Sequence, residues 1–100
     1  MDLSRFGFRA GFDPDNKWVK QDKIKLDGKE FLVSTIDLGL DHSFGGGKPL
    51  YYETMIFAIE NGEVNFTDLY CNRYSTKEEA EKEHGVLLDK LANGEITLEE

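Results

Sequence analysis

The residues best suited to chemistry lie in one polar loop, where Asp41, His42 and Ser43 precede three consecutive glycines and Lys48. Asp, His and Ser are the residue types of a hydrolytic triad. Three adjacent residues cannot pass a proton along a line, because natural triads bring their members together from separate segments. Ser43 also lacks the G-x-S-x-G turn that exposes a nucleophile. The sequence therefore predicts a binding loop and no enzyme. The alternative, an enzyme that uses His42 as a general base, would require a catalysed reaction to be found first.

The glycines of this loop suggest a ligand. Gly45, Gly46 and Gly47 give up conformational entropy and contribute no packing, so they serve either close backbone approach or a flexible connection between strands. Free N–H groups beside a lysine favour an anion, although the P-loop pattern is absent. Tyrosines after Pro49 could stack on a nucleotide base. The predicted ligand-binding set is Asp41, His42, Ser43, Gly45, Gly46, Gly47, Lys48, Tyr51 and Tyr52.

Neither a metal site nor a cofactor is expected. Asp41, His42, Glu53 and His84 are the candidate ligands, and no zinc-type spacing relates them. His84 lies on the apolar stripe of a predicted helix, where a histidine at the edge of the core is expected. Cys71 is the only cysteine, so there is no disulfide framework. As a lone thiol in a strand-like segment it is predicted to be a small core residue.

Composition indicates a globular chain of 100 residues with 39% hydrophobic residues and a net charge of −8. Residues 1–29 carry seven basic and five acidic residues, whereas residues 30–100 carry five and fifteen. Such an acidic body repels phosphates, so direct nucleic-acid binding is not expected except through the basic N-terminal part. The acidity serves either solubility or a fit to a basic groove on a partner. No apolar run approaches the ~18 residues of a membrane span, and no signal core is seen, so a cytoplasmic protein is expected.

Two Asx-Gly pairs predict β-hairpins. Asp27-Gly28 favours a two-residue type I′ turn that sets Ile24 opposite Phe31 and Lys25 opposite Glu30, and the second strand is expected to continue to about residue 40. Asn61-Gly62 predicts the same turn between strands 50–60 and 63–70. It would pair Ile59 with Val64, Phe57 with Phe66 and Glu60 with Glu63.

A helix is predicted after these strands. Thr76 and Glu79 form a capping-box pattern, an apolar stripe that includes His84 follows, and Asn93-Gly94 ends the segment. Gly85 inside the helix suggests close approach to the sheet. We therefore expect an α+β fold of about four antiparallel strands covered by one C-terminal helix (ββββα). Residues 1–18 would form an N-terminal arm whose aromatic rings pack on a single domain, residues 19–100.

Tyrosines indicate a contact surface. Alternation sends Tyr51 and Tyr52 to opposite faces of their strand, so at least one should meet solvent or a partner. Rigid amphipathic rings are favoured at protein interfaces. The sequence thus predicts a homo-oligomer, with strand 50–60 near the contact.

Two blocks, LGLDHSFGGGKPLYYETMIF (38–57) and NRYSTKEEAEKEH (72–84), resemble a group of small proteins encoded in bacteriophages and prophages. The resemblance covers about a third of the chain and carries over no catalytic residue. It implies a phage origin and the host cytoplasm as compartment. By analogy with other small acidic phage proteins, it also suggests counter-defence.

Together these observations predict a non-enzymatic phage-type binding protein that sequesters an anionic small molecule, such as a nucleotide signal. The alternative is an acidic protein–protein inhibitor of a host nuclease or defence effector, similar in kind to anti-CRISPR proteins. Its partner would be a basic host protein.

Overall fold

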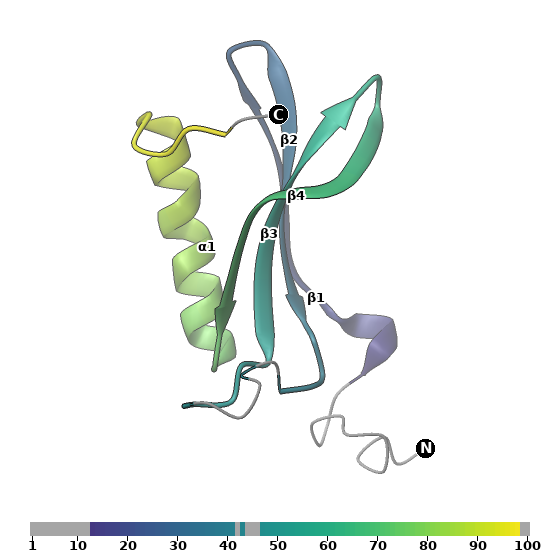
Figure 1. The fold of residues 1–100 in the computed structure, drawn as a ribbon, viewed down its shortest axis with the longest axis vertical. Helices are drawn as coiled ribbons and strands as arrows, with labels where there is room; N and C mark the ends of the chain where they lie inside the picture. Colours follow the sequence, from purple (N-terminus) through teal and green to yellow (C-terminus); the bar gives the residue numbers. More distant parts are fainter. Residues whose placement is uncertain (1–12, 42, 44–46, 99–100) are drawn as a thin grey trace.

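The computed structural model describes residues 13–41, 43 and 47–98, which form an antiparallel sheet with one helix against it (Figure 1). A short 3-10 helix, η2 (Pro14–Asn16), leads into β1 (Trp18–Leu26). The strands β2 (Lys29–Asp37), β3 (Tyr52–Glu60) and β4 (Glu63–Tyr74) follow, and α1 (Lys77–Ala92) ends the order. Sheet order is β1-β2-β3-β4, with every neighbouring pair antiparallel. The predicted ββββα architecture is confirmed; the predicted arm lies largely outside the described residues.

Both hairpins have the predicted turns. Asp27 and Gly28 have φ of 52° and 80°, and Asn61 and Gly62 have φ of 53° and 80°. Two successive left-handed residues define the type I′ turn, whose twist matches that of the flanking strands. The predicted pairs follow: Ile24 lies opposite Phe31, Lys25 opposite Glu30, Ile59 opposite Val64, and Glu60 opposite Glu63.

Strand limits depart from the prediction in three places. The third strand begins at Tyr52 instead of residue 50, so Tyr51 lies outside it. The second strand ends at Asp37 instead of continuing to about residue 40, because the Asp37 carboxylate accepts from the N–H of Gly39 (2.9 Å) and Gly39 has φ of 75°. This Asx turn takes the chain out of the sheet. The fourth strand continues past the predicted end at Tyr70 to Tyr74, which lies opposite Tyr52.

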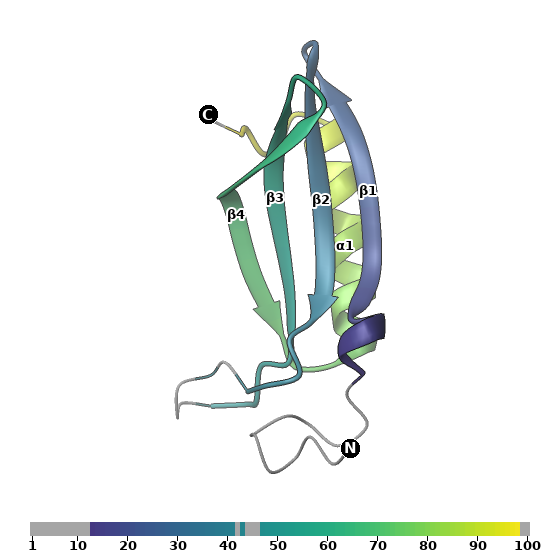
Figure 2. The same cartoon turned by 90° about the vertical axis from the view of Figure 1, so that its right-hand side faces the viewer.

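The pairing of β3 with β4 also shifts between Ile56 and Ala58. The predicted ladder pair of Phe57 and Phe66 is therefore not a register pair. Their rings still meet edge to face, with centroids 5.4 Å apart. Figure 2 shows the result: β4 bends sharply at its middle, and it pairs with β3 on both sides of the bend.

The helix has the predicted limits. The Thr76 hydroxyl accepts from the N–H of Glu79 (3.2 Å), which satisfies one of the free donors of the first turn. At the other end Gly94 has φ of 73°, as a helix-terminating glycine does. The suggested close approach at Gly85 is wrong, since a Cβ built there meets no atom within 4 Å.

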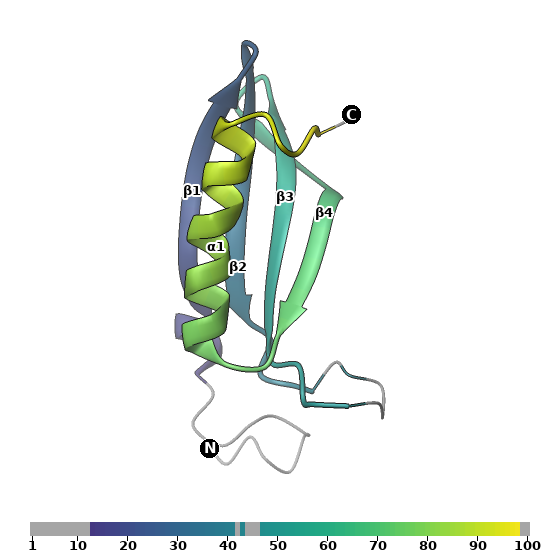
Figure 3. The same cartoon turned by 90° about the vertical axis from the view of Figure 1, so that its left-hand side faces the viewer.

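The core lies between α1 and one face of the sheet (Figure 3). Strand alternation places Phe31, Val33, Ile56 and Ala58 on that face, where they pack against Leu87 and Leu91 of the helix. A second cluster of Tyr52, Tyr74 and Ala80 closes the end nearer the start of the helix. Among the elements that the structure describes, no helix covers the opposite face. We call these the helix face and the open face.

Candidate functional site

The predicted site lies in the connection between β2 and β3, at the end of the sheet where α1 begins (Figure 1). His42, Gly45 and Gly46 lie outside the described residues. The Asp41 carboxylate accepts from the N–H of Ser43 (2.8 Å) and of Leu50 (2.9 Å), and the Ser43 hydroxyl donates to its other oxygen (3.1 Å). Asp41 therefore ties the two ends of the loop together, and Ser43 is engaged with it.

The other predicted ligand residues do not form one surface. Gly47 has φ of 70°, and both Gly47 and Lys48 are exposed. Tyr52 is only 9% exposed and packs in the core with Tyr74 and Ala80, so its ring does not face a ligand at the loop. Tyr51 is half-buried against the same cluster.

A polar hollow of about 290 Å³ lies at this end of the sheet, between η2, β1, β2 and the start of α1. Tyr52 lines it together with Asp13, Asp37 and Lys77. Two carboxylates and one ammonium group do not favour an anion. The described residues thus support a braced loop more strongly than an anion site.

A buried polar chain crosses the helix face. His84 is fully buried on α1; its Nδ1 lies 2.7 Å from the hydroxyl of Thr35 and its Nε2 lies 2.7 Å from a carboxylate oxygen of Asp22. The Thr35 hydroxyl also contacts that of Thr54 on β3. With hydrogen on Nε2, the ring donates to Asp22 and accepts from Thr35, which accepts from Thr54. Every member then has a partner, and the predicted role of His84 as a satisfied core histidine is confirmed.

Asp22, His84 and Thr35 have the residue types of a catalytic triad, but the chain is structural. Thr35 and Thr54 are completely shielded from solvent, so no substrate reaches a hydroxyl. Sequence reasoning did not find this network. The available signal was polar residues in otherwise apolar rows: Asp22 alternates with Ile24, and Thr35 with Phe31 and Val33.

The open face is the most unusual surface of the described chain. Trp18 is 56% exposed and Phe66 is 77% exposed, and both project on this face. An antiparallel sheet with one solvated face normally carries polar residues there. Here the side chains between the two rings are also largely apolar. Together they are Trp18, Leu32, Ile36, Met55, Phe57 and Phe66.

These six residues surround a hollow of about 300 Å³, with Gln21, Ser34 and Glu53 completing its walls. Glu53 is nearly buried and accepts from the Nε of Arg73 at 2.9 Å. The ammonium group of Lys17 lies 5.0 Å from the centre of the Trp18 ring. The open face therefore combines an apolar centre with charged groups at its margin, which is the usual make-up of a protein interface.

Cys71 lies on the open face, opposite Met55 on β3, and is exposed. The prediction of a small core residue is therefore wrong, because β4 is an edge strand whose outer half is not covered. Partial burial raises the pKa of the Cys71 thiol. The negative charge of Glu53 and the hydrogen bond that the thiol donates to the Glu53 carboxylate (3.5 Å) raise this pKa as well. The nearby Asp68 acts in the same direction. The thiol is thus unsuited to nucleophilic catalysis.

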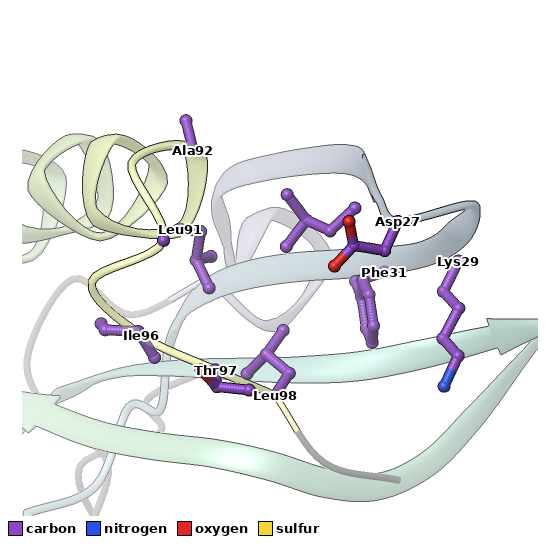
Figure 4. A pocket seen from close by; sticks show the side chains of 10 residues that line it. Asp27, Lys29, Phe31, Leu91, Ala92, Ile96, Thr97 and Leu98 are labelled. Atoms are coloured by element: carbon purple, nitrogen blue, oxygen red, sulfur yellow. The ribbon is translucent and has the colours of Figure 1, made fainter.

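A further hollow of about 310 Å³ lies at the far end of the sheet, between the β1–β2 hairpin and the chain that follows α1 (Figure 4). Phe31, Leu91, Ile96 and Leu98 form its apolar walls, and Asp27 and Lys29 stand at its edge. No buried polar group projects into this hollow from the residues that line it. We interpret this hollow as an incompletely packed edge of the core.

Comparison of the chain with protein-family models, with curated proteins and with solved structures gave no match. Within residues 13–41, 43 and 47–98, no group of three His, Cys, Asp or Glu side chains could hold a metal ion. In the same part of the chain no helix is long and apolar enough to cross a membrane. The site must therefore be argued from its own geometry, and the open face is the best supported candidate.

Proposed function

We propose that the protein is a non-enzymatic binding protein that acts through protein–protein contacts, with the open face as its docking surface. One observation carries this proposal: Trp18 and Phe66 are largely exposed beside an apolar hollow on the sheet face that the helix leaves bare. Large exposed apolar patches on a folded protein are typical of interaction sites, and Trp, Phe and Met are enriched there. Among the described residues of this face, Glu53 is paired with Arg73 and the pKa of the Cys71 thiol is raised, and neither feature favours a general base or an activated nucleophile.

Site-specific photo-crosslinking in cells tests this proposal. A photoreactive phenylalanine analogue replaces Phe66 in one variant, and Lys82 on the exposed side of α1 in a matched control. We expect a protein adduct from position 66 and none from position 82, because only the open face is proposed to be covered. Equal adducts at both positions, or none at position 66, would contradict the proposal.

The acidic balance of the chain and its resemblance to phage and prophage proteins support a basic host effector as the eventual target, with the host cytoplasm as compartment. Contact between an acidic surface and a basic groove weakens as salt rises, whereas an apolar contact does not. A target that is held by charge should therefore dissociate from the protein as the salt concentration is raised. A complex indifferent to salt would argue against charge as the basis of recognition.

Binding of an anionic small molecule, such as a nucleotide, is a second proposal for the loop. The specific observation in its favour is that Asp41 braces the loop from Ser43 to Leu50, so that Lys48 is carried on a tied loop. A ligand at a hundred times its dissociation constant stabilises a protein by about 2.7 kcal/mol. We expect nucleotides, including cyclic ones, to raise the melting temperature, and Lys48→Ala to reduce the effect. No shift with any nucleotide would count against this function and leave the open face untouched.

A further inference from the structure

We infer that the occupant of the open face is a second copy of this chain, packed sheet against sheet about a two-fold axis that runs parallel to the strands. This inference rests on the proposed function, because it names the partner of the same docking surface. Such an axis lays β1 of one copy over β4 of the other. Three observations carry it: the charges of the two edge strands, the rows across the sheet and the size of the face.

The two edge strands differ in the charges near the open face. The register places Lys23 and Lys25 of β1 on this face, whereas β4 presents Arg73 there and carries the exposed Asp68 near Cys71. Alternation places Lys23 on the open face, between Asp22 and Ile24, which both belong to the helix face. The chosen axis brings Lys23 of each copy over the β4 strand that carries Asp68 in the other. A two-fold axis across the strands would instead stack β1 on β1, where like charges meet.

The rows across the sheet bring a cation of the other copy to each exposed ring, in addition to Lys17 of the same chain at Trp18. Trp18 lies opposite Ile36, Ile36 opposite Glu53, and Glu53 opposite Arg73, so one row joins the first and last strands. Rotation about an axis parallel to the strands keeps every row at its own level. Trp18 of one copy therefore comes over Arg73 of the other, and cations bind favourably on the face of an indole ring.

The Phe66 ring also receives a cation from the other copy. Lys23 lies opposite Leu32, and Leu32 opposite Phe57, whose ring contacts Phe66. Lys23 of one copy thus comes over Phe66 of the other, close to Asp68 on the same strand. The two-fold arrangement therefore buries the apolar centre of both copies and forms each of these charged contacts twice.

The size of the face suits one copy of this protein. Four strands about 4.8 Å apart, each about nine residues long, present a flat area of roughly 600 Å². Side-chain relief raises the accessible area, and a specific interface hides about 800 Å² on each partner. Face-to-face sheets pack within about 30° of alignment, which an axis along the strands allows. The dimer would have four layers, with both copies of α1 outside.

Analytical ultracentrifugation of the full chain over a hundredfold range of concentration tests the inference. We expect a monomer–dimer equilibrium in the native protein. Trp18→Ala together with Phe66→Ala should raise the dissociation constant about thirtyfold or more, as loss of aromatic anchors at an interface does. Lys82→Ala, on the outer side of α1, should leave it unchanged. Circular dichroism checks that each variant is folded. A monomer at every concentration overturns the inference.

A charge exchange tests the axis itself. Lys23→Glu alone and Asp68→Lys alone should each weaken the dimer, because each sets like charges against one another twice in the symmetric pair. An equimolar mixture of the two variants should form a mixed dimer, because Glu at position 23 then meets Lys at position 68 and the native Lys23 meets the native Asp68. Failure of the mixture to dimerise would overturn the arrangement of β1 over β4.

The inference and the proposed function can fail separately. A crosslinked adduct at position 66 with twice the mass of the chain supports both. An adduct of another mass, with a monomer in the centrifuge, keeps the open face as a docking surface but overturns the second copy as its occupant. A monomer without any adduct at position 66 overturns both.

Discussion

The helix face and the open face of this sheet are built from the same strands, yet one is covered by α1 and the other is exposed to solvent. On the helix face, apolar side chains pack under α1, and the polar chain through His84 is completely satisfied. On the open face, apolar side chains of the same strands have no cover, and Trp18 and Phe66 project into solvent. The difference shows that an apolar strand face is not by itself a core. A core also needs a partner, and only one face finds it within the described chain.

The largest expected effect is at the buried histidine. His84→Ala removes the hydrogen-bond partner of the fully shielded Thr35 hydroxyl and leaves a cavity, which together cost roughly 4 kcal/mol in the free energy of unfolding. Asp22→Ala should cost clearly less, because the Asp22 side chain is 39% exposed and water replaces it as a partner. Urea unfolding measures both, with the exposed Glu81→Ala as control. A loss under about 1 kcal/mol for His84→Ala would show that the network is not needed for folding.

The two faces can be compared directly with one apolar truncation on each. Ile56→Ala on the helix face should cost roughly 3 kcal/mol, since this side chain is fully buried and truncation leaves a cavity. Phe66→Ala on the open face should cost under about 1 kcal/mol in the monomer, because little of the ring is buried. Dilute protein must be used, so that association does not contribute. Equal losses would mean that the open face is covered within one chain.

The fold was predictable because its signals are local. Both type I′ turns need left-handed residues, and Asp-Gly and Asn-Gly supply them; the helix limits follow from Thr76 and Gly94 in the same way. The ends of the strands were not predictable by the same means. The β2 strand stops at Asp37 because of a side-chain contact with Gly39, and the shift between β3 and β4 depends on packing across the sheet.

The candidate site was harder to predict, because it depends on which side of a strand is covered. The alternation of Leu32, Ile36 and Phe57 was visible in the sequence, but nothing local says that α1 packs on the other side. The same uncertainty explains why Cys71, which was expected in the core, is exposed, and why Tyr52, which was predicted to bind a ligand, is buried. The polar loop was predicted to be the site because Asp, His, Ser and Lys are residue types that bind ligands. In the structure the Asp41 carboxylate instead holds the two ends of the loop together.

Gly85 allows a smaller test, on the helix that covers one face. Gly85→Ala should stabilise the protein by about 1 kcal/mol, because alanine loses less backbone entropy in a helix interior than glycine. The added methyl group meets no atom within 4 Å, so no strain offsets this gain. Thermal unfolding measures the change, and Lys82→Ala on the same helix is a control without a glycine effect. A lower melting temperature would mean that α1 approaches a partner at this position.

The smallest effect concerns the thiol on the open face. Partial burial and the Glu53 carboxylate raise the pKa of Cys71, so the folded state binds the thiol proton more tightly than the unfolded chain does. The resulting contribution to stability is present below the ordinary thiol pKa and is lost as pH rises through the raised value.

The rate of alkylation against pH reports this directly. We expect its midpoint to lie higher in the folded protein than in urea, and Glu53→Gln to lower it, since that change removes a negative charge beside the sulfur; Glu53→Asp keeps the charge and is the control. A second copy over the open face should in addition slow alkylation as protein concentration rises. A midpoint that is the same in the folded and unfolded protein would mean that Cys71 feels neither burial nor Glu53, and a rate independent of concentration would mean that the open face stays bare.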